Sequence, residues 1–256
     1  MHHWTKRLFA IAAPLLLAGC LWGPGKFTSD LTLKKDGSFV LDYRGELVLQ
    51  VPEDQSTQPW TNSRAKCTEG EKPRPCTASE IADQKAEYEK KRQDSEQMAK
   101  AFGLPGLDDE SNRAFAAKLS KYAGWRSVTY RGKGVFDVDY HMEGRATQDF
   151  LFPALPDNNL IIPFVALRRR ADGSVLVTAP AFTGGSGPMS GAMAGAGDMG
   201  KGGPPSRAQG RFTVVTDGEI LTNNSEDGAA PNAIGRQLHW DVGPASNKIP
   251  ETLIRL

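Results

Sequence analysis

Four polar residues alternate along one short stretch of the chain and could bind a single ion together. Asp137, Asp139, His141 and Glu143 are spaced two residues apart. On a β-strand such residues share one face, about 6.6–6.8 Å apart along the strand. Carboxylate and imidazole groups ligate metal ions and act as general acids or bases. The row is therefore a candidate metal site, and Asp137, Asp139 and His141 would serve a metal-dependent hydrolase.

The same row has a simpler explanation. Apolar side chains occupy the positions between the polar ones, namely Phe136, Val138, Tyr140 and Met142. One polar and one apolar face is typical of an antiparallel strand that meets water on one side. No second set of ligands accompanies the row, so we expect a solvated strand face and keep the hydrolase as the alternative.

Other catalytic motifs fail at a required position. Ser186 lies in Gly-Gly-Ser-Gly-Pro, which lacks the last glycine of a nucleophile elbow. Residues 195–202 resemble a phosphate-binding loop but end in Gly202, where Ser or Thr must hold magnesium. We therefore expect a non-catalytic protein without a cofactor. The net charge of +1 gives no reason to expect nucleic acid as a partner.

The N-terminus has the pattern of a secretory signal. Lys6 and Arg7 precede an apolar run, Leu8 to Leu17, that ends in Leu17-Ala18-Gly19-Cys20. This run is about half the roughly 20 residues that a transmembrane helix needs. The ending resembles a bacterial lipobox. That resemblance implies that residues 1–19 are a signal peptide removed before Cys20. It also implies diacylglycerol on the Cys20 sulfur and an acyl chain such as palmitate on the new amino terminus.

The stretch from Cys20 through Leu-Trp-Gly-Pro-Gly-Lys-Phe resembles envelope lipoproteins of Gram-negative bacteria. More distantly, a cysteine followed by strand, Asp-Gly and strand is similar to the LppM-type lipoprotein domain, a β-rich fold with a proposed lipid-binding role. The resemblance implies a chain anchored in the cell envelope, where two or more acyl chains hold it stably. Leu21 after the cysteine implies the inner leaflet of the outer membrane, facing the periplasm. The expected partner is a lipid ligand or another envelope protein.

Two cysteines remain besides the lipidation site. Cys67 and Cys76 form an even pair, and an oxidising compartment favours a disulfide between them. Two thiolates without a nearby histidine make a poor zinc site. The pair therefore predicts a disulfide that closes a short loop.

Alternating apolar residues flank three Asp-Gly pairs, which predicts three β-hairpins. The pairs are Asp36-Gly37, Asp172-Gly173 and Asp217-Gly218. Glycine-rich residues 184–205 contain three methionines and predict a flexible, disordered loop. We expect one α+β domain over residues 20–256, with an antiparallel β-sheet and a two-helix insertion at about 77–122.

The insertion should begin with a long polar helix. Thr77-Ala-Ser-Glu80 matches a capping box, and the helix should run to about Phe102. It offers few apolar docking residues, and we expect it to be mostly solvated. A second helix, from Asp108 to Tyr122, has apolar residues at helical spacing and should pack on the sheet. A cupped sheet around an apolar cavity would favour lipid binding, whereas a packed core would favour protein contacts.

Overall fold

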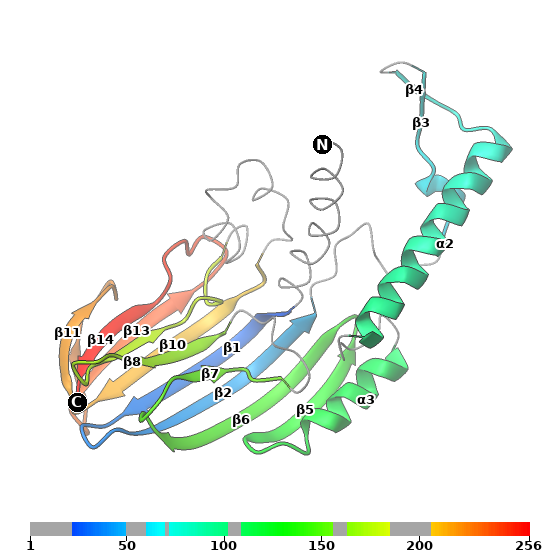
Figure 1. Ribbon diagram of the computed structural model, residues 1–256. Helices are drawn as coiled ribbons and strands as arrows, with labels where there is room; N and C mark the ends of the chain where they lie inside the picture. Colours follow the sequence, from blue (N-terminus) through cyan, green and yellow to red (C-terminus); the bar gives the residue numbers. More distant parts are fainter. Residues whose placement is uncertain (1–21, 50–59, 70–71, 102–108, 156–162, 185–205) are drawn as a thin grey trace, which may run out of the picture.

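Two β-sheets face each other and are built from the alternating segments of the sequence (Figure 1). The computed structural model describes residues 22–49, 60–69, 72–101, 109–155, 163–184 and 206–256. The predicted signal peptide, Cys20 and nearly all of the Gly/Met-rich loop lie outside these residues. A mixed α+β architecture is confirmed, but the described residues form two large sheets and a separate two-stranded one in place of the single sheet expected.

The larger sheet has seven strands in the order β12-β13-β10-β1-β2-β6-β5. Its strands are β1 (Trp22–Leu33), β2 (Ser38–Leu49), β5 (Trp125–Gly132), β6 (Val135–Arg145), β10 (Gln209–Thr216), β12 (Ala230–Pro231) and β13 (Arg236–Val242). The smaller sheet has the order β11-β14-β9-β8-β7. It comprises β7 (Phe150–Phe152), β8 (Val165–Arg169), β9 (Val175–Thr178), β11 (Glu219–Asn223) and β14 (Glu251–Arg255).

Two of the three predicted hairpins are confirmed. The turn at Asp36-Gly37 joins the antiparallel strands β1 and β2, and the turn at Asp172-Gly173 joins β8 and β9. Gly37 and Gly173 have φ of 83° and 84°, which glycine adopts without the steric cost of a side chain.

The third hairpin is wrong, and so is the expectation of purely antiparallel pairing. Strand β10 pairs in parallel with β1 on one side and antiparallel with β13 on the other. Both edges of β10 are therefore occupied, and β11 pairs with β14 in the second sheet. The Asp217 carboxylate accepts a hydrogen bond of 2.6 Å from the Lys35 backbone N–H. This bond links the Asp217-Gly218 turn, which connects β10 in the larger sheet to β11 in the smaller sheet, to the β1–β2 turn.

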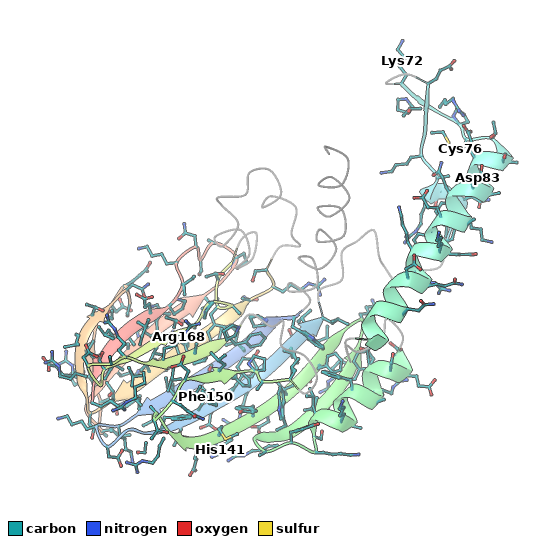
Figure 2. The ribbon with its side chains drawn as sticks, in the orientation of Figure 1. Lys72, Cys76, Asp83, His141, Phe150 and Arg168 are labelled. Atoms are coloured by element: carbon teal, nitrogen blue, oxygen red, sulfur yellow. A yellow bond between two sulfur atoms is a disulfide. The ribbon has the colours of Figure 1, made fainter. Side chains whose placement is uncertain are left out.

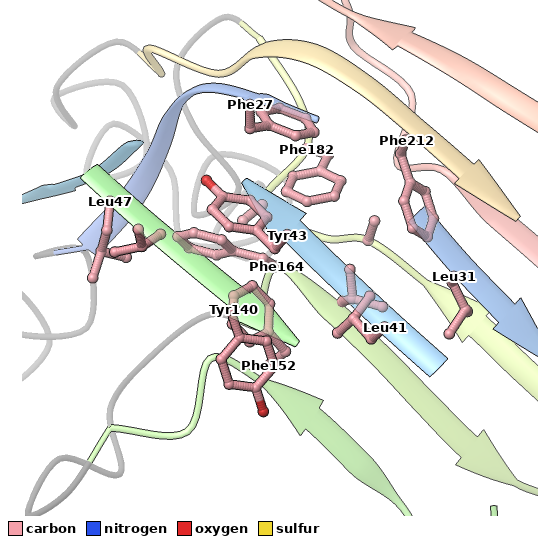
Figure 3. Packing of buried hydrophobic residues seen from close by; sticks show 14 of the residues in the cluster. Phe27, Leu31, Leu41, Tyr43, Leu47, Tyr140, Phe152, Phe164, Phe182 and Phe212 are labelled. Carbon is pink, nitrogen blue, oxygen red and sulfur yellow. The ribbon is translucent and has the colours of Figure 1, made fainter. Parts of the chain in front are cut away.

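The core between the sheets is a cluster of aromatic rings (Figure 3). Phe182 is fully buried and stacks on Phe27 with ring centroids 4.1 Å apart. Tyr43, Phe152 and Phe164 surround this pair at centroid distances typical of favourable ring contacts. These side chains fill the space in which a cupped sheet would hold an apolar ligand.

Helix α3 (Asp109–Leu119) packs against the larger sheet, as its apolar spacing predicts. Phe115 and Leu119 are buried, and the Phe115 ring stacks on Trp22 at 5.3 Å. Tyr122 instead remains 46% exposed because the helix ends three residues earlier.

A separate segment projects from the sheets, and we call it the arm (residues 60–69 and 72–101). It contains the short helix η3 (Asn62–Arg64), strands β3 (Cys67–Glu69) and β4 (Lys72–Arg74), and helix α2 (Ala78–Ala101). Helix α2 extends away from both sheets and holds the β3–β4 hairpin at its outer end (Figure 1). No helix in the described ranges is long and apolar enough to cross a membrane.

Candidate functional site

The row of polar residues lies on the outer face of the larger sheet. Phe136, Val138 and Tyr140 of the same strand are buried in the core, so the alternation is the one expected of a half-solvated strand. The Asp137 carboxylate accepts a hydrogen bond of 2.5 Å from Arg131 Nε. Asp139 Oδ2 lies 3.6 Å from Arg44 Nε on the neighbouring strand β2. Each aspartate of the row thus faces a guanidinium group.

His141 is held between two carboxylates. Its Nδ1 lies 2.8 Å from Asp42 Oδ1, across from it on β2, and its Nε2 lies 3.1 Å from Glu143 Oε1. Because carboxylates only accept, both ring nitrogens must donate, which favours the imidazolium form. The hydrogen bond to Asp42 is the main cause that raises the pKa of His141, burial opposes it, and Glu143 raises it further.

The sheet does not gather this row into a metal site. In the part of the chain that the structure describes, no group of three or more His, Cys, Asp or Glu residues is placed to hold a metal ion. Sequence reasoning missed the partners Asp42 and Arg44. Both lie between the apolar residues that alternate after Asp36-Gly37, so the hairpin pattern could have placed them on the polar face of β2. Their register against β6, however, cannot be read from the local pattern, because β6 follows β2 only after the arm, α3 and β5.

Neutralising Asp42 should lower the pKa of His141. With this pKa raised, the stabilising contribution of the imidazolium is complete below about pH 6.5 and is lost as the pH rises through the folded-state value. We expect Asp42→Asn to lower the pKa more than Glu143→Gln does, as followed by the imidazole NMR signals. An unchanged pKa in Asp42→Asn would contradict this geometry.

The arm has its own set of contacts, which follow one stripe of α2. Glu80, Gln84 and Tyr88 are spaced four residues apart and lie on the same side of the helix. Gln84 accepts a hydrogen bond of 3.1 Å from the Lys66 N–H and donates one of 3.2 Å to the Lys66 carbonyl. The Arg64 guanidinium lies 5.5 Å from the centre of the Tyr88 ring. The stripe therefore binds the segment that precedes the helix.

A capping box, an ion pair and a disulfide stabilise the beginning of α2. The predicted capping box is confirmed, with the Thr77 N–H donating to Glu80 at 2.9 Å and the Glu80 N–H donating to the Thr77 hydroxyl at 3.3 Å. Arg74 binds both Glu80 oxygens and is the main cause that lowers the pKa of Glu80 to about 2. Cys67 and Cys76 form the predicted disulfide, with Cα atoms 5.3 Å apart. The arm is thus a locally closed unit.

One of the few apolar residues of α2 packs within the arm itself. Tyr88 contacts Trp60 and Arg64 of the arm itself. Figure 2 shows Lys72 and Cys76 at the outer end of the arm, remote from His141 and Phe150 on the sheets. The arm tip is therefore presented away from the folded body.

Comparison with solved structures gives a weak likeness of fold. No family model and no curated protein matches the sequence. The fold is similar to the folded domain of LppM from Mycobacterium tuberculosis, solved by NMR, at 10% sequence identity. The match covers 91% of each chain, and the TM-score is 0.25. LppM is also the type of domain that the N-terminal sequence resembles, but a likeness at this level carries no argument about function.

Proposed function

We propose that this chain is a lipid-anchored envelope protein that binds another envelope protein through its arm and performs no catalysis. The observation that carries the proposal is the arm itself: a long polar helix that projects from the sheets and ends in a disulfide-closed hairpin. A helix that is polar all round either bridges through solvent or depends on ion pairs along its surface. This helix has such pairs, for example Glu87 with Lys91 at 2.8 Å.

The dimensions of the arm suit a bridging role. A helix of 24 residues spans about 36 Å. Ordering so many residues costs conformational entropy that little apolar burial offsets. The disulfide and the contacts of Glu80, Gln84 and Tyr88 restrain the outer half of this helix. These restraints support the interpretation that the tip is presented in a defined shape.

The packed core supports protein contacts over an internal lipid ligand. Phe182, Phe27 and Tyr43 occupy the space between the sheets.

Anchoring at Cys20 would place β1 at the membrane surface, since the two residues from Cys20 to Trp22 span at most about 7 Å. We propose the inner leaflet of the outer membrane as the site of anchoring. Among the described residues, no observation favours the metal-dependent hydrolase.

A photo-crosslinker tests the arm in intact cells. Placed at Lys72 in the full chain, it should yield one dominant protein adduct, whereas the same crosslinker at Arg168 on the sheets should not. Cys67→Ser/Cys76→Ser should reduce the Lys72 adduct at least about fivefold, because the hairpin loses its covalent closure. Equal adducts from Lys72 and Arg168, or a lipid adduct alone at Lys72, would refute protein binding by the arm.

The same cells test the anchor separately. Labelled palmitate should enter the wild-type chain and not Cys20→Ala, which should leave the membrane fraction. Label retained in Cys20→Ala would contradict lipidation at this residue without affecting the result for the arm.

A further inference from the structure

A shallow, open depression of about 530 Å³ lies on the outer face of the larger sheet, near the beginning of β1. Lys26, Phe27, Thr28, Arg44 and Gln209 line it, from strands β1, β2 and β10. Two of these side chains are cationic and two are neutral and polar. None of the described residues that line it is acidic.

An irregularity in β1 places Lys26 at this position. The register between β1 and β2 shifts between Pro24 and Phe27, so Lys26 has a partner in β10, Gln209, and none in β2. A bulge of this kind redirects side chains and often accompanies binding sites. The Lys26 side chain is exposed on the outer face, and Phe27 next to it is buried in the core.

Glu46 on β2 is acidic, but it binds the backbone of Lys26 and not the Lys26 side chain. One oxygen of the Glu46 carboxylate, Oε2, accepts a hydrogen bond of 2.9 Å from the Lys26 backbone N–H. A Cβ atom on Gly25 would lie 2.2 Å from that same oxygen, so glycine leaves the room that this bond needs. Glu46 therefore stabilises the bulge through the backbone. Within the described contacts, the Lys26 ammonium forms no ion pair.

Arg44 is the more available of the two arginines in this region. It is 64% exposed, and its ion pair with Asp139 is long, at 3.6 Å. Arg211 on β10, by contrast, binds both oxygens of Asp241 at 2.7 and 3.0 Å. Exposed pairs such as Arg44–Asp139 contribute little and exchange partners easily. Lys26 and Arg44 are thus the cations that can turn to a ligand.

We propose that this depression binds a phosphate-type anion. Lys26 supplies a point charge and Arg44 a planar pair of donors, the two cationic groups that recognise phosphate oxygens. The Thr28 hydroxyl and the Gln209 amide supply further donors at the same depression. The ligand is a free phosphate or the phosphate of a lipid headgroup. Lys26 is six positions after Cys20, about 20 Å at most, so the anchor of the proposed function would bring headgroups near.

The Thr28 methyl group provides a probe inside the depression. The full chain, labelled at threonine methyls, is placed in phosphatidylcholine nanodiscs and titrated with inorganic phosphate. A second sample contains phosphatidylglycerol and no free phosphate. We expect the Thr28 methyl signal to shift while that of Thr252, buried in the second sheet, stays constant.

Three variants separate this site from general charge effects. Lys26→Gln and Arg44→Gln should each weaken phosphate binding about tenfold, the loss of one charge-assisted hydrogen bond. Glu46→Gln keeps an oxygen that can accept the Lys26 N–H and removes a negative charge, so it should strengthen binding. Lys35→Gln, on the β1–β2 turn at the other end of β1, is the control and should leave the affinity unchanged.

Each result decides one question. A shift with inorganic phosphate alone identifies a free anion, and a shift in phosphatidylglycerol discs alone identifies a headgroup. A headgroup result that disappears in Cys20→Ala, with phosphate binding intact, would tie the site to the anchor. No Thr28 shift in either sample, or equal weakening by Lys35→Gln and Lys26→Gln, would overturn the proposal.

Discussion

Phe182→Ala should lower the free energy of unfolding by about 3–5 kcal/mol, the cost of removing a fully buried aromatic ring. The ring stacks on Phe27 at 4.1 Å and meets the Phe212 ring edge to face at 5.5 Å, so its loss leaves a cavity between the two sheets. Denaturant unfolding at constant slope measures the change.

The control for this prediction is another aromatic residue. Tyr122 is 46% exposed, and Tyr122→Ala should change the free energy of unfolding by less than about 0.5 kcal/mol. A loss below about 1 kcal/mol in Phe182→Ala would mean that the core between the sheets is loosely packed.

Gly210→Ala should also be strongly destabilising and should deplete the folded protein. A Cβ atom at this position would lie 1.9 Å from the Phe27 carbonyl oxygen, so β1 and β10 would have to move apart. We expect a loss of about 3 kcal/mol or more, because overpacking against backbone cannot be relieved by a rotamer change. Circular dichroism and denaturant unfolding of the purified chain would measure it.

Gly243→Ala is the matched control for Gly210→Ala. A Cβ atom on Gly243 would meet no other atom within 4 Å. We expect the free energy of unfolding to change by less than about 0.5 kcal/mol. Equal stability of the two variants would show that β1 and β10 do not approach each other this closely at Gly210.

Phe182→Ala and Gly210→Ala test contacts that local sequence patterns do not reveal. Gly210 lies in β10, far along the chain from Phe27, and only the parallel pairing of β1 with β10 brings the two together. Nothing near Gly210 in the sequence indicates that a methyl group would be excluded there.

Local interactions determined the elements that the sequence predicts correctly. The Asp36-Gly37 and Asp172-Gly173 turns and the capping box of Thr77 and Glu80 all depend on residues within a few positions of each other. The disulfide of Cys67 and Cys76 likewise closes a short loop. The alternation along β6 correctly predicted which side chains face water.

The tertiary structure alone decided what faces that polar row. Asp42 and Arg44 reach His141 and Asp139 because β2 and β6 pair across the whole inserted arm. The resulting ion pairs favour a solvated strand face over a metal site as the interpretation of the row. Likewise, the partners of Glu80, Gln84 and Tyr88 are known only once the segment before the helix is seen to fold back against it.

The sequence by itself thus determined the alternation of β6, the two helices, two hairpins and the disulfide, because each is specified by neighbouring residues. The tertiary structure decided that β10 lies between β1 and β13, which left Asp217-Gly218 as a crossing between sheets. It also decided that Lys26 and Arg44 line one depression. Such contacts depend on which strand edges remain unpaired once the chain has folded, and no local pattern encodes that competition.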